Sequence, residues 1–174
     1  MTKNRNEIGI YVQSFDMKYP MVYWEGNPGS PSLVSNQMIK VGKALDYPNR
    51  MKKYERTFGF RASEPNWKSI RDYYAKKGIT DLNFNRCDGC DSKEPHHHVK
   101  REYFRSTGLI SSDTKVLNDI NLEIEGHIGE VFKEHKIKGF NNKGTLKEYY
   151  CKSQLQNVIK EIDCFIEEKE KQIK

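Results

Sequence analysis

The first half of the chain contains short runs of β-branched and aromatic residues bounded by turn-forming residues, and this pattern predicts a small sheet. Ile8–Phe15 is one such run, and Met38–Val41 is another that ends at Gly42. Runs of this length between Gly, Pro and Asn are typical of strands. Met21–Trp24 predicts a further short strand. Residues 25–36 hold two glycines and two prolines, so they are expected to form an inserted loop.

Helical patterns occupy much of the remaining chain. Asp46 is placed to cap a helix that runs to about Glu55, and Gly78 is placed to end a second helix. Apolar residues at helical spacing predict two longer helices, one from about Asp113 and one after Ser153. All four predicted helices therefore follow the predicted strands in sequence.

The length of 174 residues suffices for one compact domain but not for two ordinary ones. Residues 81–108 differ from the rest, with two cysteines, three histidines and no clear periodicity, and are expected to form an insertion. The predicted fold is a single α/β (α+β) domain spanning residues 1–174. It has a small three-stranded, mainly antiparallel sheet flanked by helices, together with the Cys/His-containing insertion.

The charge balance is basic, with 30 Lys and Arg against 24 Asp and Glu, a net charge of +6. This excess suits a nucleic-acid backbone as partner, but it suits a soluble basic protein equally well, so charge alone does not choose. No run approaches the ~20 apolar residues of a membrane span. The four cysteines do not resemble a disulfide framework, which favours a reducing, cytoplasmic setting.

Two short motifs and a helix carry the most specific pattern. The chain reads Gly-Ile-Tyr at 9–11 and Lys-Val-Gly at 40–42, and the helix that follows bears Arg50 and Tyr54. In this order they resemble the GIY-YIG nuclease superfamily, whose two motifs lie on neighbouring strands before a helix with an essential Arg. Lys40 stands where the second motif has Tyr, as in some phage-type members and restriction enzymes. The stretch between Tyr11 and Lys40 is longer than the family's usual hairpin.

The resemblance also implies a metal-binding Glu later in the chain. Glu123 precedes His127 by one helical turn, as in the family's later motif, and is therefore expected to hold Mg²⁺ or Mn²⁺. Glu125 and Glu102 are the alternatives. A single carboxylate with waters and phosphate oxygens is a sufficient site for Mg²⁺.

Phosphodiester hydrolysis needs a deprotonated water and positive groups where charge develops. A tyrosine has a reference pKa near 10, so it becomes a base only where cations stabilise its phenolate. Lys40 and Arg50 are the cations expected to do so, and the base is then Tyr11 or Tyr54, with Tyr11 preferred. The resemblance thus implies a metal-dependent DNA endonuclease. Its expected catalytic residues are Tyr11, Lys40, Arg50, Tyr54, Glu123 and His127.

A short nuclease with its own insertions resembles a type II restriction enzyme more than a repair nuclease. Cutting both strands often requires two copies, which implies a homodimer. The basic side chains expected to contact phosphates or bases are Arg61, Lys68, Arg71, Lys76, Lys77, Arg86, Lys100 and Arg101.

The insertion has the residues of a zinc site. Two thiols in a C-x-x-C spacing lie near a run of histidines, and such a set suits tetrahedral Zn²⁺. The expected ligands are Cys87, Cys90, His96 and His98. Free cysteines beside neutral loop histidines are the alternative reading.

Two other functions remain open. The C-x-x-C segment also resembles the start of an HNH nuclease, which would use His98 as base and His127 as a metal ligand. Asn118 or Asn121 would orient that base. No second C-x-x-C follows near His127, and the motifs at the N-terminus stay unexplained on this view. A non-catalytic DNA-binding or inhibitory protein on the same scaffold is the other possibility.

Overall fold

The computed structural model describes residues 4–17, 20–25, 30–57, 67–80, 99–138 and 145–173. Its main feature is a five-stranded antiparallel sheet with the strand order β5-β1-β4-β7-β6. The strands are β1 (Gly9–Phe15), β4 (Met38–Ala44), β5 (Val99–Ser106), β6 (Lys136–Lys138) and β7 (Thr145–Cys151). A separate antiparallel hairpin consists of β2 (Met21–Glu25) and β3 (Ser30–Val34).

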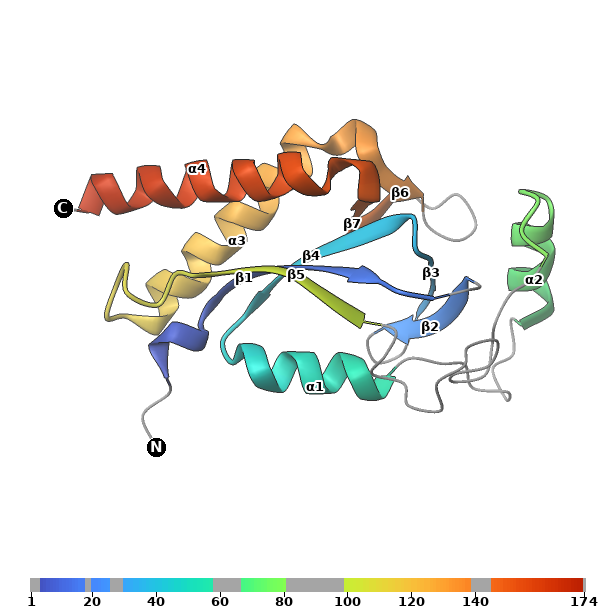
Figure 1. Ribbon diagram of the computed structural model, residues 1–174, viewed down its shortest axis with the longest axis horizontal. Helices are drawn as coiled ribbons and strands as arrows, with labels where there is room; N and C mark the ends of the chain where they lie inside the picture. The colour runs from blue at the N-terminus through green and yellow to red at the C-terminus, as the bar shows by residue number, and fades with distance from the viewer. Residues whose placement is uncertain are drawn as a thin grey trace.

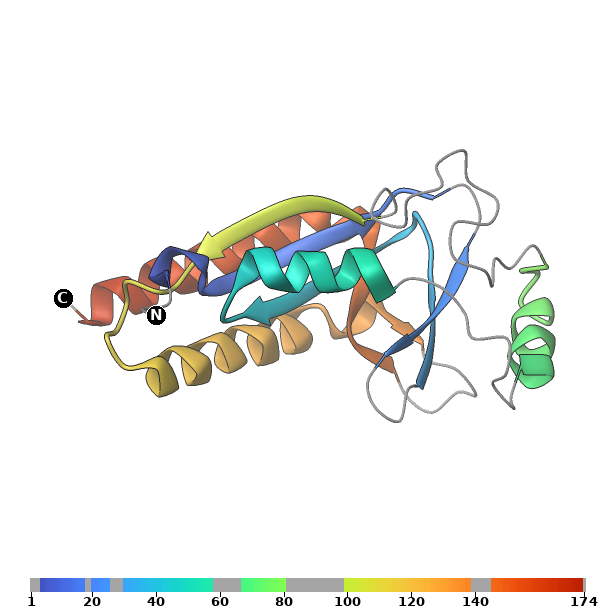
Figure 2. The same ribbon diagram turned by 90° about the horizontal axis from the view of Figure 1, so that it is seen from below.

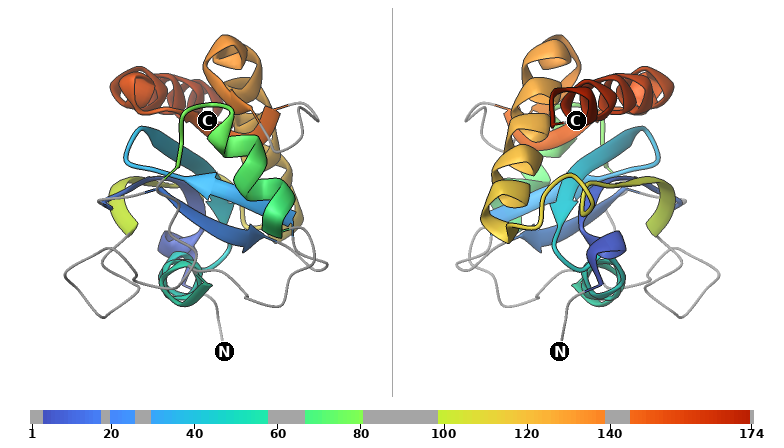
Figure 3. Two further views of the ribbon diagram at one scale, coloured as in Figure 1. Left: turned by 90° about the vertical axis from the view of Figure 1, so that its right-hand side faces the viewer. Right: turned by 90° about the vertical axis from the view of Figure 1, so that its left-hand side faces the viewer.

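The helices lie on both faces of the sheet (Figure 1). They are α1 (Tyr47–Thr57), α2 (Trp67–Ala75), α3 (Thr114–Val131) and α4 (Leu155–Ile173), with short 3-10 turns at Arg5–Glu7, Lys133–His135 and Lys152–Gln154. The view from below shows α1 alone across one face, and the end-on views show α3 and α4 together on the other (Figures 2 and 3). The α2 helix lies at the end of the molecule next to the β2–β3 hairpin (Figure 1).

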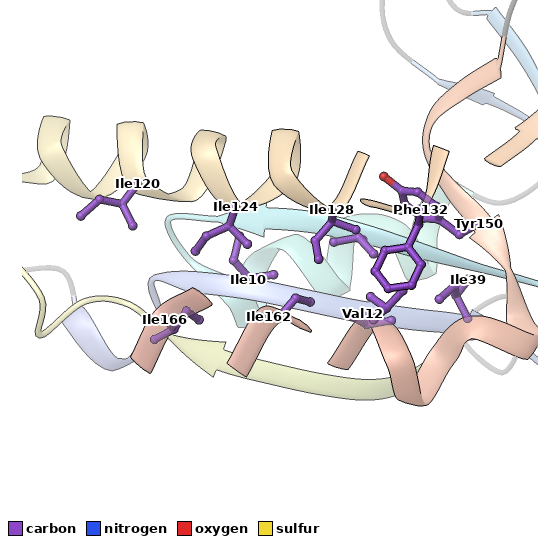
Figure 4. Close-up of a cluster of buried hydrophobic side chains, with 12 residues drawn as sticks. Ile10, Val12, Ile39, Ile120, Ile124, Ile128, Phe132, Tyr150, Ile162 and Ile166 are labelled. Carbon is purple, nitrogen blue, oxygen red and sulfur yellow. The ribbon is translucent and has the colours of Figure 1, made fainter. Parts of the chain in front are cut away.

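The largest core cluster lies between the sheet and the helices α3 and α4. Ile10 and Val12 point from β1 toward Ile124 of α3 and Ile162 of α4, and all four side chains are buried (Figure 4). Burying one such side chain contributes roughly 1.5–3 kcal/mol relative to leaving it exposed. The alternate residue of β1, Tyr11, packs with Met51 of α1 on the opposite face. Because helices cover both faces, all seven residues of β1 are buried.

The prediction of a three-stranded sheet is wrong, because the sheet has five strands. The strand β5 forms within residues 81–108, which were expected to be an insertion. It is an edge strand with charged residues such as Lys100 and Arg101, so it lacks the apolar alternation of a strand with one buried face. The strand β6 has only three residues, too few for any pattern to appear.

The expected loop at residues 25–36 also contains a strand, β3. Its sequence, Ser-Pro-Ser-Leu-Val, begins with polar and turn-forming residues, which hid it. Pro31 is tolerated because, among the described strands, β3 pairs only with β2, so one of its edges needs no ladder hydrogen bonds to them. The strands expected at Ile8–Phe15, Met21–Trp24 and Met38–Val41 are confirmed.

Two helix termini follow the expected signals, and a third is capped by the residue at which the helix was expected to begin. Asp46 accepts a hydrogen bond from the backbone N–H of Asn49 at 3.1 Å at the start of α1. Asp113 caps α3 in the same way through Lys115 N–H at 2.9 Å. Gly78, after α2, has a φ of 80°, a conformation that favours glycine.

Replacing Ile124 by Ala should lower the free energy of unfolding by about 2–5 kcal/mol, because the fully buried side chain leaves a cavity between α3 and the sheet. Denaturant unfolding followed by circular dichroism measures this. Val116→Ala in the same helix is the matched control, since Val116 is 40% exposed and its truncation should change stability by less than about 0.5 kcal/mol. Equal losses in both variants would contradict the described core.

Candidate functional site

The site lies along one edge of β4. The described pairing with β7 covers only Met38, Ile39 and Lys40, whereas the pairing with β1 continues to Ala44. The helix α3 passes beside the part of β4 that β7 does not pair (Figures 1 and 2). Two hollows open between these elements.

The first hollow, here named the acidic pocket, has a volume of about 400 Å³. Its lining includes Val41, Leu122, Glu125, Glu130, Lys136 and Glu148. The second, here named the basic pocket, has a volume of about 270 Å³. Its lining includes Lys43, Asp46, Asn49, Arg50, Asn118 and Asn121. Both follow the same helix, α3, and they share no lining residue.

Two carboxyl groups meet in the acidic pocket, Glu125 from α3 and Glu148 from β7. The pKa of Glu125 is raised to about 7, mainly by burial and then by the charge and hydrogen bond of Glu148, while Lys43 and Lys40 oppose the shift. The Oε1 atom of Glu125 is buried and has no hydrogen-bond partner within the described part of the chain. The pocket thus holds a carboxyl oxygen whose bonding capacity is unused.

Lys40 connects β4 to this carboxyl pair. Its side chain is only 1% exposed, and its Nζ lies 3.4 Å from Oε2 of Glu148. The same Nζ lies 5.2 Å from the centre of the Tyr149 ring. A buried lysine requires a charge partner because desolvation penalises an isolated ammonium group. Glu148 is such a partner, so Lys40 holds this carboxylate at the pocket.

The basic pocket lies at the start of α1. Lys43 donates from Nζ to Oδ1 of Asn118 at 2.8 Å, which holds the ammonium group between β4 and α3. Arg50 lines the same pocket from the first turns of α1 and is exposed. Two cations from different elements therefore flank one hollow.

Tyr11 lies on the α1 side of the sheet and is 1% exposed. The register pairs it with Gly42 and pairs Gln13 with Lys40, so Tyr11 and Lys40 start from the same sheet face. A Cβ atom on Gly42 would lie 2.3 Å from the Tyr11 hydroxyl, which explains why glycine occupies this motif position. Tyr11 fills the space between β4 and α1.

Glu123 and His127 lie on the side of α3 that faces α4. Glu123 pairs with Lys169 at 2.8 Å, and His127 lies 2.8 Å from Oε1 of Glu161. The structure therefore brings Lys40 together with Glu125, not with Glu123. The weaker alternative, Glu102 of β5, accepts a hydrogen bond from Ser14 at 2.6 Å.

The predicted zinc ligands and the side chain of Tyr54 lie outside the part of the chain that the structure describes. Cys87, Cys90, His96 and His98, and with them the predicted zinc site, lie in residues 81–98, outside the described residues. The backbone of Tyr54 belongs to α1, but its side chain is likewise not described. In the ranges that the structure does describe, no group of three or more His, Cys, Asp or Glu side chains forms a metal cluster.

Sequence reasoning missed Glu148 and Lys43 as site residues. Nothing in a charged residue on a short strand distinguishes a pocket carboxylate from a solvated one. A signal existed for Glu125, since it directly follows the buried Ile124 and so lies beside the apolar stripe of α3. Helical periodicity alone does not show which flank of that stripe faces α4, so it does not distinguish Glu123 from Glu125.

Comparison of the chain with family models, with curated proteins and with solved structures finds no match. Across the described helices, none combines the length and apolar character needed to cross a membrane.

Gly42→Ala should destabilise the protein by about 1–3 kcal/mol, because the new methyl group overlaps the hydroxyl of Tyr11, which is packed under α1. Thermal and denaturant unfolding measure the effect. Gly126→Ala in α3 is the control. Apart from the backbone of its own helix, no atom of the described residues lies within 4 Å of its added Cβ, so alanine should stabilise the helix by roughly 0.5–1 kcal/mol. A neutral effect at Gly42 would contradict the close approach of Tyr11.

Glu125 should make stability fall as pH rises. Its pKa is raised from 4.5 to about 7 in the folded state, so the folded protein binds a proton that the unfolded chain loses above pH 4.5. The contribution is complete below pH 4.5 and is lost as pH rises through 7. In buffer with a chelator, Glu125→Gln should gain roughly 1–2 kcal/mol on wild type across this window, after allowance for solvent screening.

Unfolding curves at several pH values test this expectation. Glu123→Gln is the matched control, because it removes a carboxylate from the same helix on the side that pairs with α4. Parallel pH profiles for wild type and Glu125→Gln would show that Glu125 and Glu148 do not meet as described.

Proposed function

We propose that this protein is a metal-dependent DNA endonuclease whose metal site is the carboxyl pair Glu125 and Glu148. One observation carries the proposal. A buried carboxyl oxygen without a partner in the described part of the chain lies beside a second carboxylate, and the cations Lys43 and Arg50 line the neighbouring basic pocket along α3. Metal-dependent hydrolysis of a phosphodiester uses carboxylates that hold the metal ion next to cations that bind the phosphate.

The carboxyl pair fits Mg²⁺ or Mn²⁺. Burial and the adjacent Glu148 raise the pKa of Glu125 to about 7, so the pair holds a proton up to about neutral pH. Glu125 and Glu148 would hold a divalent cation in place of that proton. Mg²⁺ commonly uses one or two carboxylates and completes its shell with waters and substrate phosphates. When bound, the ion would supply charge stabilisation at a phosphoryl oxygen and lower the pKa of a water.

The other residues of the two pockets, and Tyr11 beneath α1, have separate roles. Lys40 pairs with Glu148 and so positions that carboxylate. Lys43 and Arg50 line the basic pocket and offer positive charge to the DNA backbone. Tyr11 is buried against Gly42, so its task in this proposal is to hold α1 against the sheet. The metal ligand expected as Glu123 becomes Glu125.

DNA is the substrate class that the surface charge favours. The net charge is +6, and α2 and the turn after it present exposed Lys68, Arg71, Lys76 and Lys77. Cation-rich surfaces of this kind suit a polyanion. Cleavage as a homodimeric type II restriction enzyme is the specific form we propose. The free cysteines Cys151 and Cys164 of the described chain agree with a reducing, cytoplasmic setting.

The HNH alternative receives less support from this geometry. It requires His127 as a metal ligand, whereas His127 pairs with Glu161 and packs against the Phe165 ring, with 4.9 Å between ring centres. His127 is partly exposed and links α3 to α4 through these two contacts, so it contributes to the packing of the two helices.

Cleavage assays with matched variants test the proposal. Plasmid and linear DNAs of varied sequence are incubated with the protein and Mg²⁺ or Mn²⁺. Glu125→Gln and Glu148→Gln should each reduce cleavage on the order of 100-fold or more, because each removes a metal ligand. Glu123→Gln should cleave as wild type does. Calorimetric titration with Mn²⁺ should show the same order of variants without any substrate.

Three results would overturn parts of the proposal. Loss of cleavage in Glu123→Gln with activity retained in Glu125→Gln would return the site to the other side of α3. Loss in His98→Ala alone would favour the HNH reading. Binding of DNA without cleavage, across varied sequences and both metals, would favour a non-catalytic binding protein.

A further inference from the structure

Asn121 is a buried polar residue that the proposed metal site does not use. Its side chain is 1% exposed and lines the basic pocket. Within the described residues, its Nδ2 atom has no hydrogen-bond partner. An unpaired buried amide is costly, so such a group in a pocket points to a ligand that accepts its hydrogen bond.

The hydroxyl of Thr107 determines how Asn121 presents this amide. Thr107 is completely buried and donates to Oδ1 of Asn121 at 2.8 Å. Its own backbone N–H is held by the carbonyl of Ile8 at 2.8 Å. The carboxamide is thereby anchored through its oxygen to the rigid start of the sheet, and its nitrogen remains as a preorganised donor.

The groups around Asn121 select an anion. Lys43 and Arg50 line the same pocket, and the pocket lies at the N-terminus of α1, an 11-residue helix whose dipole favours negative charge there. Asp46 is the carboxylate among the lining residues, but one of its oxygens already accepts the N–H of Asn49 as a helix cap. Two cations and an amide donor that converge from three elements suit a phosphate group.

The position of this pocket relative to the acidic pocket indicates which phosphate it holds. Asn121 and Glu125 lie one helical turn apart on α3, a rise of about 6 Å. That rise is of the order of the separation between successive phosphates on a DNA strand. Lys43 lies between the two hollows, since it lines the basic pocket and its charge acts on Glu125.

We propose that the basic pocket binds the DNA phosphate next to the one that is cleaved, with Asn121 as a direct ligand alongside Lys43 and Arg50. The identity of the neighbouring phosphate rests on the proposed function, whereas the affinity of the pocket for phosphate does not. When successive phosphates occupy the two pockets, the DNA strand is held in one register. This register places the bond to be cleaved next to the metal site.

The first experiment uses inorganic phosphate as the probe and no cleavage. In isotope-labelled wild-type protein, the side-chain amide signal of Asn121 should shift saturably in nuclear magnetic resonance spectra as phosphate is added. Asn121→Asp keeps the shape of the side chain but replaces the donor with a negative acceptor, so phosphate affinity should fall about tenfold or more. Arg50→Gln should weaken binding in the same assay.

Asn157→Asp is the matched control. Asn157 is exposed on α4, where its side chain donates to Gln154 at 3.1 Å, so phosphate affinity should equal that of wild type. An unmoved Asn121 signal at saturating phosphate would overturn the proposal, as would equal affinity in wild type and Asn121→Asp. The wild-type spectrum does not depend on whether any variant folds.

The second experiment tests the register. A duplex that the enzyme cuts at one position is made with a single neutral methylphosphonate next to the cleaved bond. Wild type should cleave it about tenfold more slowly than the unmodified duplex, and Asn121→Ala should show little further loss from the same modification. Equal sensitivity of wild type and Asn121→Ala would overturn the assignment of this phosphate to the pocket. Absence of all cleavage, with phosphate binding intact, would instead count against the proposed function.

Discussion

The burial of β1 on both faces is the constraint on which the rest of the structure depends. A strand with one solvated face needs helices on its other face only. In β1, however, Ile10 and Val12 on one face and Tyr11 and Gln13 on the other are all buried. The helices α3 and α4 must therefore cover one face and α1 the other. This sandwich places the first turns of α1 and the flank of α3 at the same edge of β4.

The chemistry of the site follows from where the sheet stops pairing. The described pairing of β7 with β4 ends at Lys40, and α3 passes beside the rest of β4 (Figure 2). Charged side chains can then meet at that edge without disturbing a ladder. Lys40 and Glu148 pair there, and Glu125 joins them from α3. Further along β4, Lys43 donates a hydrogen bond to Asn118 of α3. Partial burial strengthens these interactions, and it is the main reason that the pKa of Glu125 is raised.

Much of the secondary structure could be predicted from local patterns. The strands β1 and β4 and the caps of α1 and α3 carry strong signals, because β-branched runs and capping side chains act within a few residues. The strands β3 and β5 escaped prediction. Both lie at an edge, where one side of the backbone and much of the side-chain surface need no apolar cover, and so neither shows a periodic pattern.

The sequence by itself determined the order of the elements, the placement of the Gly-Ile-Tyr and Lys-Val-Gly segments on neighbouring strands, and the presence of basic and acidic residues suited to a phosphodiester. Only the tertiary structure decided which carboxylate lines the acidic pocket. Glu123 and Glu125 flank the same buried residue, Ile124, and are equivalent in a helical pattern. Packing of α4 against one flank of α3 uses Glu123 in an ion pair, while the other flank opens onto β7 and leaves Glu125 beside Glu148. Side-chain direction relative to a distant element is a property of packing, which local periodicity does not encode.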